Sequence, residues 1–306
     1  MFTVIGFYKF NSITEKQLLS AKLALELCAK DNFISGLVIV ATEGINGTVC
    51  GSDKALALFK EVLIEHFGES NWPWKESQAE SNAFKRFKVK IREEIVTTGL
   101  DNPVRVIEQG DALSPKQWHE MLNSQRDDVV IIDTRNHYET ELGVFEGAVD
   151  PGLVNFQEFG EYIAKSDIPK DKTVLMYCTG GIRCEKAIYQ MRELGYPTVF
   201  QLQGGILNYL KEFPDGKFDG ECFVFDQRVA VTRELEPSSR WALCPHCGQP
   251  GDVELNCVRC SKRAKVCKRC VDEAKMNTCS KDCCNQLERL NARTKKQSME
   301  NSSAPE

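Results

Sequence analysis

Short apolar strands alternate with amphipathic helices over the first 98 residues. Apolar runs and period-two alternation predict four strands, and apolar residues spaced three and four apart predict two helices. The predicted strands are 2–10, 35–41, 44–51 and 84–96, and the predicted helices are 14–30 and 52–67. Thr14 precedes the first helix as its N-cap. The order βαββαβ predicts a ferredoxin-like (acylphosphatase-like) domain over residues 1–98.

A second α/β pattern covers residues 114–218, after a connecting segment at 99–113. Ser114 and Pro115 mark the start of a helix, as an N-cap followed by proline in the first turn. Apolar runs then alternate with helical segments, and these runs lie at 128–133, 172–178 and 197–202. Strands that alternate with helices predict a parallel sheet covered on both faces.

The remaining chain, 219–296, contains a strand-like run at 221–231, a cysteine-rich segment and a polar helix from about 281 to 296. Residues 297–306 are polar and unpatterned, which predicts a disordered tail. No apolar run approaches the length of a membrane span. The apolar N-terminus lacks the basic region and cleavage site of a signal peptide. We therefore expect a cytoplasmic protein without a membrane partner.

Nine of the fourteen cysteines lie between 244 and 284, which in a reducing compartment indicates metal ligands rather than disulfides. Eight of them form three Cys-x2-Cys pairs and one Cys-x3-Cys pair: Cys244/Cys247, Cys257/Cys260, Cys267/Cys270 and Cys279/Cys283. Eight thiolates suffice for two tetrahedral sites, so two structural zinc ions are expected, with an iron–sulfur cluster or metal-free thiols as the alternatives. The short intervening segments favour interleaved sharing of the pairs, first with third and second with fourth, over consecutive sharing.

Charge is unevenly distributed along the chain. Residues 228–296 contain 15 Lys/Arg and 8 Asp/Glu, although the whole chain has a net charge of −5. Zinc-bound thiolates would offset part of this excess, but 259–269 still has six Lys/Arg and no acid. Together with the basic run at 84–90, this segment indicates a polyanionic partner. A solvated charged surface is the simpler alternative.

A thiol lies in a tight turn between a strand and a helix. The loop consists of Cys178, Thr179, Gly180, Gly181, Ile182 and Arg183. The helix N-terminus and the arginine both favour the thiolate, which is the nucleophilic form of cysteine. The Cys-x4-Arg spacing is one residue shorter than the Cys-x5-Arg cradle of cysteine phosphatases, which indicates a sulfur carried on the cysteine rather than a phosphate. A cysteine that merely ends a buried strand is the alternative.

Three further residues near this loop are candidate site residues. Asp133 and Arg135 end the first strand of the second domain, at the sheet edge where loops meet in parallel α/β folds. They either bind substrate and order the loop or form a buried ion pair. Cys184 follows the loop directly and is either a resolving thiol or a structural residue.

Several motifs resemble those of known proteins. The stretches DTRNHYE (133–139), CTGGIR (178–183) and LQGGI (202–206) resemble the signatures of a rhodanese domain. The chain from about 1 to 290 is similar to a narrower group, the rhodanese-domain tRNA uridine hydroxylases. That similarity is carried by motifs at 41–52, 87–99, 176–187 and 220–231.

The resemblance implies an enzyme that hydroxylates the wobble uridine of tRNA at C5, giving 5-hydroxyuridine, with molecular oxygen as co-substrate. It implies tRNA as partner and Cys178 as the essential cysteine, carrying a persulfide by analogy with rhodaneses. The sequence has no glycine-rich flavin or NAD fingerprint, and His137 with Glu139 lacks a second histidine for an iron site. The electron or sulfur donor is not identified. A persulfide-carrying sulfurtransferase and a non-enzymatic RNA-binding module are the alternatives.

Overall fold

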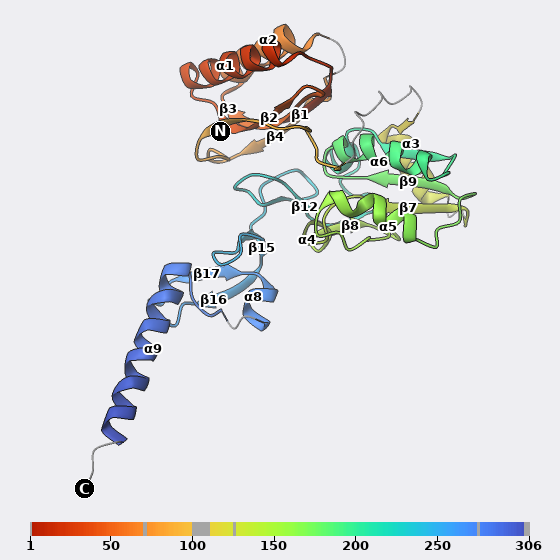
Figure 1. Cartoon of the computed structure of the whole chain (residues 1–306). Coiled ribbons are helices and arrows are strands. Elements are labelled where there is room, and N and C mark those ends of the chain that lie inside the picture. Colours follow the sequence, from red (N-terminus) through yellow and green to blue (C-terminus); the bar gives the residue numbers. More distant parts are fainter. Residues whose placement is uncertain (1, 70–71, 100–110, 125–126, 274–275, 303–306) are drawn as a thin grey trace. The chain divides into compact units, whose positions relative to one another are not determined.

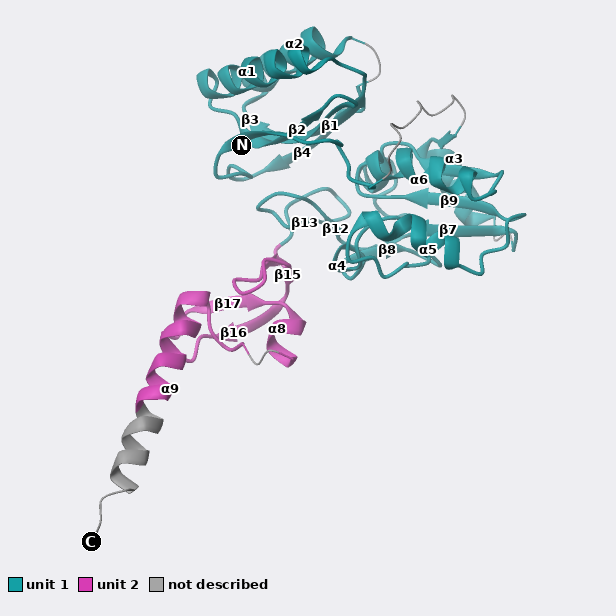
Figure 2. Ribbon diagram, viewed as in Figure 1, with its two compact units in different colours: residues 1–238 teal, residues 239–306 magenta. Residues whose placement is uncertain are grey.

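The computed structural model of the chain describes residues 2–69, 72–99, 111–124, 127–273 and 276–302. The chain forms two compact units, Met1–Ser238 and Ser239–Glu306 (Figure 2). The first unit contains the N-terminal domain, up to residue 99, and a parallel-sheet domain from residue 111. The second unit contains the cysteine-rich segment.

The N-terminal domain is a five-stranded sheet with two helices on one face (Figure 1). Its elements are β1 (Phe2–Phe10), α1 (Glu15–Asp31), β2 (Ser35–Ala41), β3 (Gly44–Gly51), α2 (Asp53–Phe67), β4 (Lys75–Ala79) and β5 (Phe87–Ile91). Thr14 and Gln17 form a reciprocal capping box at the start of α1, as the predicted N-cap requires. Buried Leu25 of α1 and Phe59 of α2 pack with the apolar face of the sheet in one core.

The strand order β4-β1-β3-β2-β5 corrects the predicted closing strand. The residues predicted as one strand at 84–96 form only the short β5, which pairs in parallel with β2 at the far edge. The fourth strand of the ferredoxin-like arrangement is instead β4, antiparallel to β1. Its sequence KESQA has no apolar pattern because four of its five residues are partly or fully exposed. Hydrophobic periodicity therefore does not reveal it.

The second domain has a four-stranded sheet, in the order β6-β10-β9-β7, and all strands are parallel. Its elements are β6 (Ala112–Leu113), α3 (Pro115–Asn123), β7 (Val129–Asp133), α4 (His137–Thr140), β8 (Gly143–Phe145), η1 (Phe156–Glu158), α5 (Phe159–Lys165), β9 (Thr173–Tyr177), α6 (Ile182–Glu193), β10 (Val199–Leu202) and α7 (Gly205–Glu212). Successive residues of β9 point to opposite faces of the sheet: Met176 packs with α5 and α6, and Tyr177 packs with α3 and α7. Both faces are therefore covered, as predicted.

Two expected boundaries of this domain differ from the structure. Ala112 and Leu113 were assigned to the connecting segment but form edge strand β6, a two-residue strand too short to produce a periodic signal. The rest of that segment, 100–110, lies outside the described residues. The run at 221–231 is not one strand but a hairpin of β12 (Cys222–Phe223) and β13 (Ala230–Val231), preceded by β11 (Phe218–Gly220), which pairs with β8. The chain reverses between them in a turn in which the Val229 N–H donates to the Asp226 carbonyl and Val229 is left-handed, with a φ of 65°.

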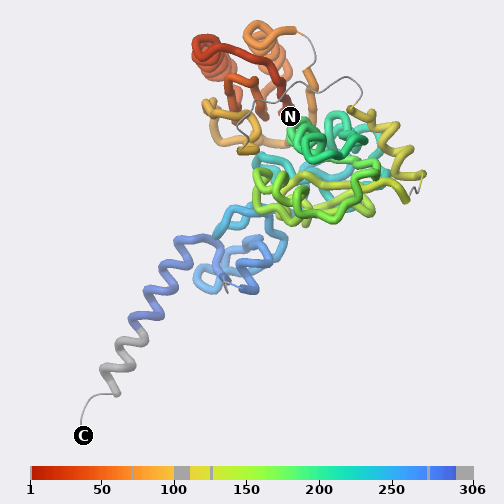
Figure 3. Tube along the Cα trace, turned by 45° about the vertical axis from the view of Figure 1, so that its right-hand side comes forward, coloured from red at the N-terminus to blue at the C-terminus, as the bar shows by residue number. Residues whose placement is uncertain are grey.

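The second unit contains four short strands and two helices among its described residues. These are β14 (Ala242–Leu243), β15 (Pro250–Gly251), β16 (Val253–Asn256), β17 (Arg263–Val266), α8 (Lys268–Asp272) and α9 (Lys281–Ser302). Figure 3 follows the chain through this unit into α9. The helix continues to Ser302 instead of ending near 296, because no glycine or proline interrupts it before Pro305. Residues 303–306 of the predicted tail lie outside the described residues.

None of the helices within the described ranges combines the length and apolar character that crossing a bilayer requires.

Helix α6 connects to the N-terminal domain through a buried ion cluster. The Lys186 amine donates to Glu43 Oε1 at 2.9 Å and also to Glu94. The lysine side chain is only 1% exposed, and the two carboxylates are 11% and 17% exposed. Glu43 also accepts the Ile95 backbone N–H at 2.6 Å. This cluster fixes α6 against the loops that follow β2 and β5.

Replacing Lys186 by Met should lower the free energy of unfolding by about 3 kcal/mol, because two largely buried carboxylates lose their counter-charge. Urea denaturation followed by circular dichroism measures the change. The matched control is Lys22→Met, which removes a partly exposed i,i+4 pair with Glu26 and should cost only about 0.3–0.5 kcal/mol. Equal losses in the two variants would contradict a structural role for the cluster.

Candidate active site and metal centres

Cys178 lies in the loop between β9 and α6, and its side chain is fully buried. The Gly181 N–H donates to Cys178 Sγ at 3.0 Å. Gly181 caps α6 in a left-handed conformation, with a φ of 98°, which glycine adopts without strain. The loop therefore directs backbone donors at the sulfur, as the sequence predicts.

The LQGGI motif closes this loop from the other side. The Ile206 N–H donates to the Cys178 carbonyl at 3.0 Å, and the Leu207 N–H donates to the Thr179 carbonyl at 3.2 Å. A Cβ atom on Gly205 would lie 2.5 Å from the Cys178 carbonyl oxygen, which is too close for any side chain. Glycine at 205 thus allows the start of α7 to pack directly on the thiol loop.

The loop arginine is held by a carboxylate. Arg183 donates to both oxygens of Glu139, at 2.6 and 2.8 Å, and both side chains are buried. This bidentate geometry fixes the guanidinium beside the loop. Glu139 lies in the short helix α4. Its ion pair with Arg183 gives the acidic residue at the end of the DTRNHYE motif a structural role.

Asp133 and Arg135 form a second buried pair. Arg135 donates to both oxygens of Asp133, at distances of 2.6 to 3.0 Å, and to the Gly143 carbonyl at 2.6 Å. Neither side chain lines the cavity described below. Of the two roles left open by the sequence, the structure favours the ion pair that orders loops.

The two thiols of the loop influence each other. Burial opposes ionisation of Cys178, but the hydrogen bond from the Cys184 thiol, the Arg183 charge and the N–H groups of Arg183 and Gly180 together hold the pKa of Cys178 well below its usual range. Burial raises the pKa of Cys184, and its thiol also lies 3.6 Å from Thr134 Oγ1. These surroundings favour the thiolate form of Cys178 over that of Cys184.

The thiol loop borders a cavity of about 460 Å³. Thr179, Gly180 and Ile182 line it together with Cys178 and Arg183. The opposite wall comes from β1, β3 and β4 of the N-terminal domain, and the turn between β12 and β13 adds Phe225 and Arg228. Both domains of the first unit therefore build one site.

Sequence reasoning missed the contribution of the N-terminal domain to this cavity. Tyr8, Asn46 and Lys75 line it. Asn46 lies inside the motif at 41–52, so that motif was a usable signal. Lys75 begins the unrecognised strand β4, so no pattern in the sequence pointed to it.

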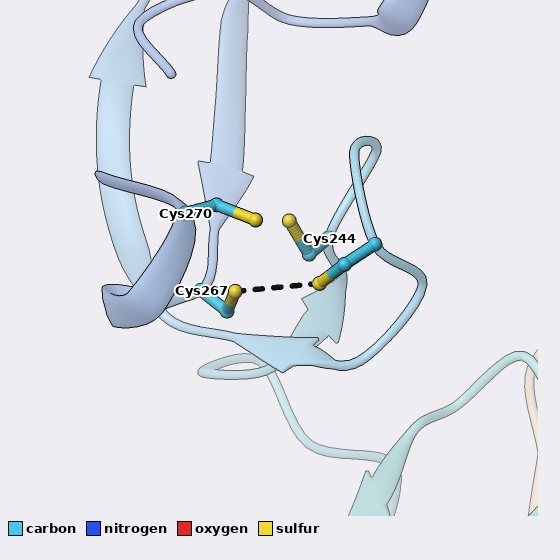
Figure 4. A group of neighbouring side chains, drawn as sticks. Cys244, Cys267 and Cys270 are labelled. Carbon is cyan, nitrogen blue, oxygen red and sulfur yellow. Dashed lines mark hydrogen bonds between the residues drawn. The ribbon is translucent and has the colours of Figure 1, made fainter. Parts of the chain in front are cut away.

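The cysteine pairs come together in the interleaved grouping. Cys244, Cys247, Cys267 and Cys270 form one cluster, and Cys257, Cys260, Cys279 and Cys283 form the other. In each cluster the sulfur atoms all lie within 4.8 Å of one another. Figure 4 shows the sulfurs of Cys244, Cys267 and Cys270 pointing toward a common centre.

The sulfur spacing fits a tetrahedral zinc ion. Zinc–sulfur bonds of about 2.3 Å place neighbouring sulfurs about 3.8 Å apart in a tetrahedron. The Cys247–Cys267 and Cys260–Cys279 sulfur distances are 3.4 and 3.5 Å. Four thiolates leave no coordination position for a reactant, so ions held here would stabilise the unit.

Three family models match the chain. A UPF0176 acylphosphatase-like domain covers residues 2–95, a rhodanese-like domain covers 114–212, and a rhodanese C-terminal domain covers 219–284. The chain is 44% identical to a tRNA uridine(34) hydroxylase of Bdellovibrio bacteriovorus, over 95% of this chain and 83% of that protein. The chain belongs to the tRNA uridine(34) hydroxylase family. Proteins of the same name from Acinetobacter baumannii (strain AYE) and Teredinibacter turnerae are each 40% identical to it, over 88% and 89% of this chain and 85% and 84% of theirs.

Family membership confirms the resemblance, and the matched models agree with the fold that the hydrophobic pattern predicts. The acylphosphatase-like domain corresponds to the sheet that carries β4, and the rhodanese-like domain corresponds to the parallel sheet that carries the thiol loop. The third model includes all eight cysteines of the two clusters and ends at residue 284, near the start of α9.

Exchanging both Cys257 and Cys260 for Ser should release bound metal and make the second unit protease-sensitive. Structural zinc contributes about 10–16 kcal/mol to folding in small zinc domains, and this unit buries few apolar side chains to replace it. Metal analysis and limited proteolysis measure both effects. Cys284→Ser, which lies outside both clusters, is the control. Native protein that contains neither zinc nor iron would contradict the assignment.

Proposed function

We propose that this protein hydroxylates the wobble uridine of tRNA at C5 to give 5-hydroxyuridine, using molecular oxygen as co-substrate. The relatives named tRNA uridine(34) hydroxylase support this proposal, because they match nearly the whole chain and not the rhodanese-like domain alone. The observation that carries it is the position of Cys178 at a cavity built from both domains. An enzyme that acts on tRNA in this way works in the cytoplasm.

The cavity suits chemistry on an extruded base. Enzymes that modify a base take it out of the stack and hold it in a pocket, and an anticodon base is already unpaired. The Cys178 thiolate is the nucleophile of this pocket, and adding it to C6 of uracil would activate C5 toward an oxidant. A persulfide on Cys178 is the second form in which the sulfur could act. Both forms require the thiolate.

Arg183 and Cys184 support the thiolate in this proposal. Arg183 supplies a fixed positive charge and Cys184 a hydrogen bond, and Cys184 can also resolve a persulfide on Cys178. Zinc in the two cysteine clusters would hold the second unit in shape. An unidentified donor must supply electrons for hydroxylation.

The second unit offers a surface for the tRNA phosphates. Among the six basic residues at 259–269, Arg259, Lys262, Arg263, Lys268 and Arg269 are exposed. Lys265 differs, because its amine donates to the Ser239 and Arg240 carbonyls. The expected phosphate contacts therefore come from the exposed set.

Replacing Cys178 by Ser should abolish 5-hydroxyuridine formation while tRNA affinity stays within a few-fold. Serine keeps the fold but is not appreciably ionised near neutral pH, so only the chemical step is lost. The measurement is nucleoside analysis of tRNA from a strain that lacks the native enzyme and expresses each variant. Cys28→Ser, outside the loop and cavity, should retain full activity.

The same nucleoside analysis separates the proposed function from its alternative. Loss of a thiolated base, with 5-hydroxyuridine unchanged, would favour a sulfurtransferase. Full 5-hydroxyuridine in the Cys178→Ser strain would remove the loop thiol from the mechanism.

Replacing Lys262, Arg263 and Lys268 together by Gln should weaken tRNA binding and flatten its dependence on salt. Each lost phosphate contact removes about 0.7–0.9 from the slope of log K against log salt. Filter binding at several salt concentrations gives the slope. The matched control replaces Lys16, Lys54 and Lys60 of the N-terminal domain by Gln. An unchanged slope in the first variant would place the RNA surface elsewhere.

A further inference from the structure

Three cationic side chains line the cavity beside Cys178, and two of them are paired with carboxylates. These are Lys75, Arg183 and Arg228. Arg183 is paired with Glu139 as described above, and Arg228 donates to both carboxylate oxygens of Asp226, at 2.6 and 2.9 Å. Within the described part of the chain, no carboxylate forms an ion pair with Lys75. Its charge is the one available to an anion that forms in the cavity.

Lys75 lies directly against the thiol loop. Its Cε and Cδ atoms are 3.4 and 3.5 Å from the position of a Cβ atom built on Gly180. Its amine donates to the Pro73 carbonyl at 3.1 Å and lies 4.6 Å from the centre of the Tyr8 ring. The aromatic face and the carbonyl hold the ammonium in place without neutralising it.

Three titratable groups face Lys75 from other elements: Tyr8 from β1, Cys178 from the loop and Glu185 from α6. Glu185 is occupied by other donors, because its Oε1 accepts from the Tyr8 hydroxyl at 2.8 Å and from Gln201 Nε2 at 3.1 Å. Burial lowers the pKa of Lys75 to about 8, although the charges of Cys178 and Glu185 oppose this shift. An amine in this range gives up a proton readily near neutral pH.

We infer that Lys75 of the N-terminal domain is a catalytic acid of the site, giving its proton to the pyrimidine when the Cys178 thiolate adds to the ring. This inference rests on the proposed function. In that step the sulfur electron pair forms the bond to C6. The C5=C6 π pair moves into the enolate that ends at the C4 carbonyl oxygen. The ammonium then transfers one proton to the enolate and becomes a neutral amine. No oxidant is consumed, and elimination reverses the step.

The test compares Lys75→Met, Lys75→Arg and the control Lys60→Met in the full-length protein. Like Lys75, Lys60 lies over an aromatic ring of the same domain, in its case Trp74, but it does not line the cavity. Two readouts are measured. The first is the rate of 5-hydroxyuridine formation. The second is the pH midpoint at which the Cys178 thiolate forms. It is obtained from ultraviolet absorbance, as the difference between each variant and the same variant that also carries Cys178→Ser.

Lys75→Met should raise the thiolate midpoint by about one pH unit, because a nearby positive charge is lost. It should also slow the reaction by about 100-fold or more, the usual contribution of a general acid. Lys75→Arg should restore the midpoint but not the rate, since arginine keeps the charge and does not release a proton near neutral pH. Lys60→Met should change neither quantity.

A normal rate in Lys75→Arg, or an unchanged rate and midpoint in Lys75→Met, would overturn the inference. Circular dichroism shows whether Lys75→Met is folded. If this variant unfolds, the rate of Lys75→Arg alone decides whether Lys75 is the catalytic acid. The two proposals fail separately. Absence of 5-hydroxyuridine in the wild-type reaction would refute the proposed function, while the midpoint still reports whether Lys75 acts on Cys178.

Discussion

The first unit depends on one requirement, the stabilisation of a thiolate at the buried Cys178 sulfur. Removing a thiolate from water is costly unless dipoles and charges replace the lost hydration. Here the replacement comes from the Gly181 N–H, the Cys184 thiol and the guanidinium of Arg183. Each of these depends on another part of the chain. Glu139 holds the guanidinium, and the start of α7 holds the loop backbone, so three separate sequence motifs serve a single sulfur atom.

The N-terminal domain completes this arrangement from outside the parallel sheet. Lys186 on α6 reaches Glu43 and Glu94, and Tyr8 reaches Glu185 on the same helix. The helix that begins at the thiol loop is therefore tied at two points to a domain of different fold. This explains why the cavity has polar groups from β1, β3 and β4 on one wall and the thiol loop on the other.

The parts that sequence reasoning predicted well are those with a local physical signature. The Cys-x4-Arg turn, the helix N-caps and the cysteine pairs each involve residues a few positions apart. The interleaved grouping of the thiols also agreed with expectation. The misses include β4, whose polar residues show no periodicity, and Lys75, which lines the Cys178 cavity only when the two domains are packed together. Asp133 and Arg135 were ambiguous because a buried ion pair and a substrate clamp use the same residue types.

The alternation of the two thiol clusters along the chain couples their assembly. An ion held by the first cluster closes the loop from Cys247 to Cys267, and that loop carries the Cys257/Cys260 pair of the second cluster. An ion in the second cluster likewise closes the loop that carries Cys267 and Cys270. Each loop closure holds the ligands of the other cluster closer together, and so reduces the entropic cost of binding the second ion. Loading is thus expected to be cooperative, with half-metallated intermediates scarcely populated.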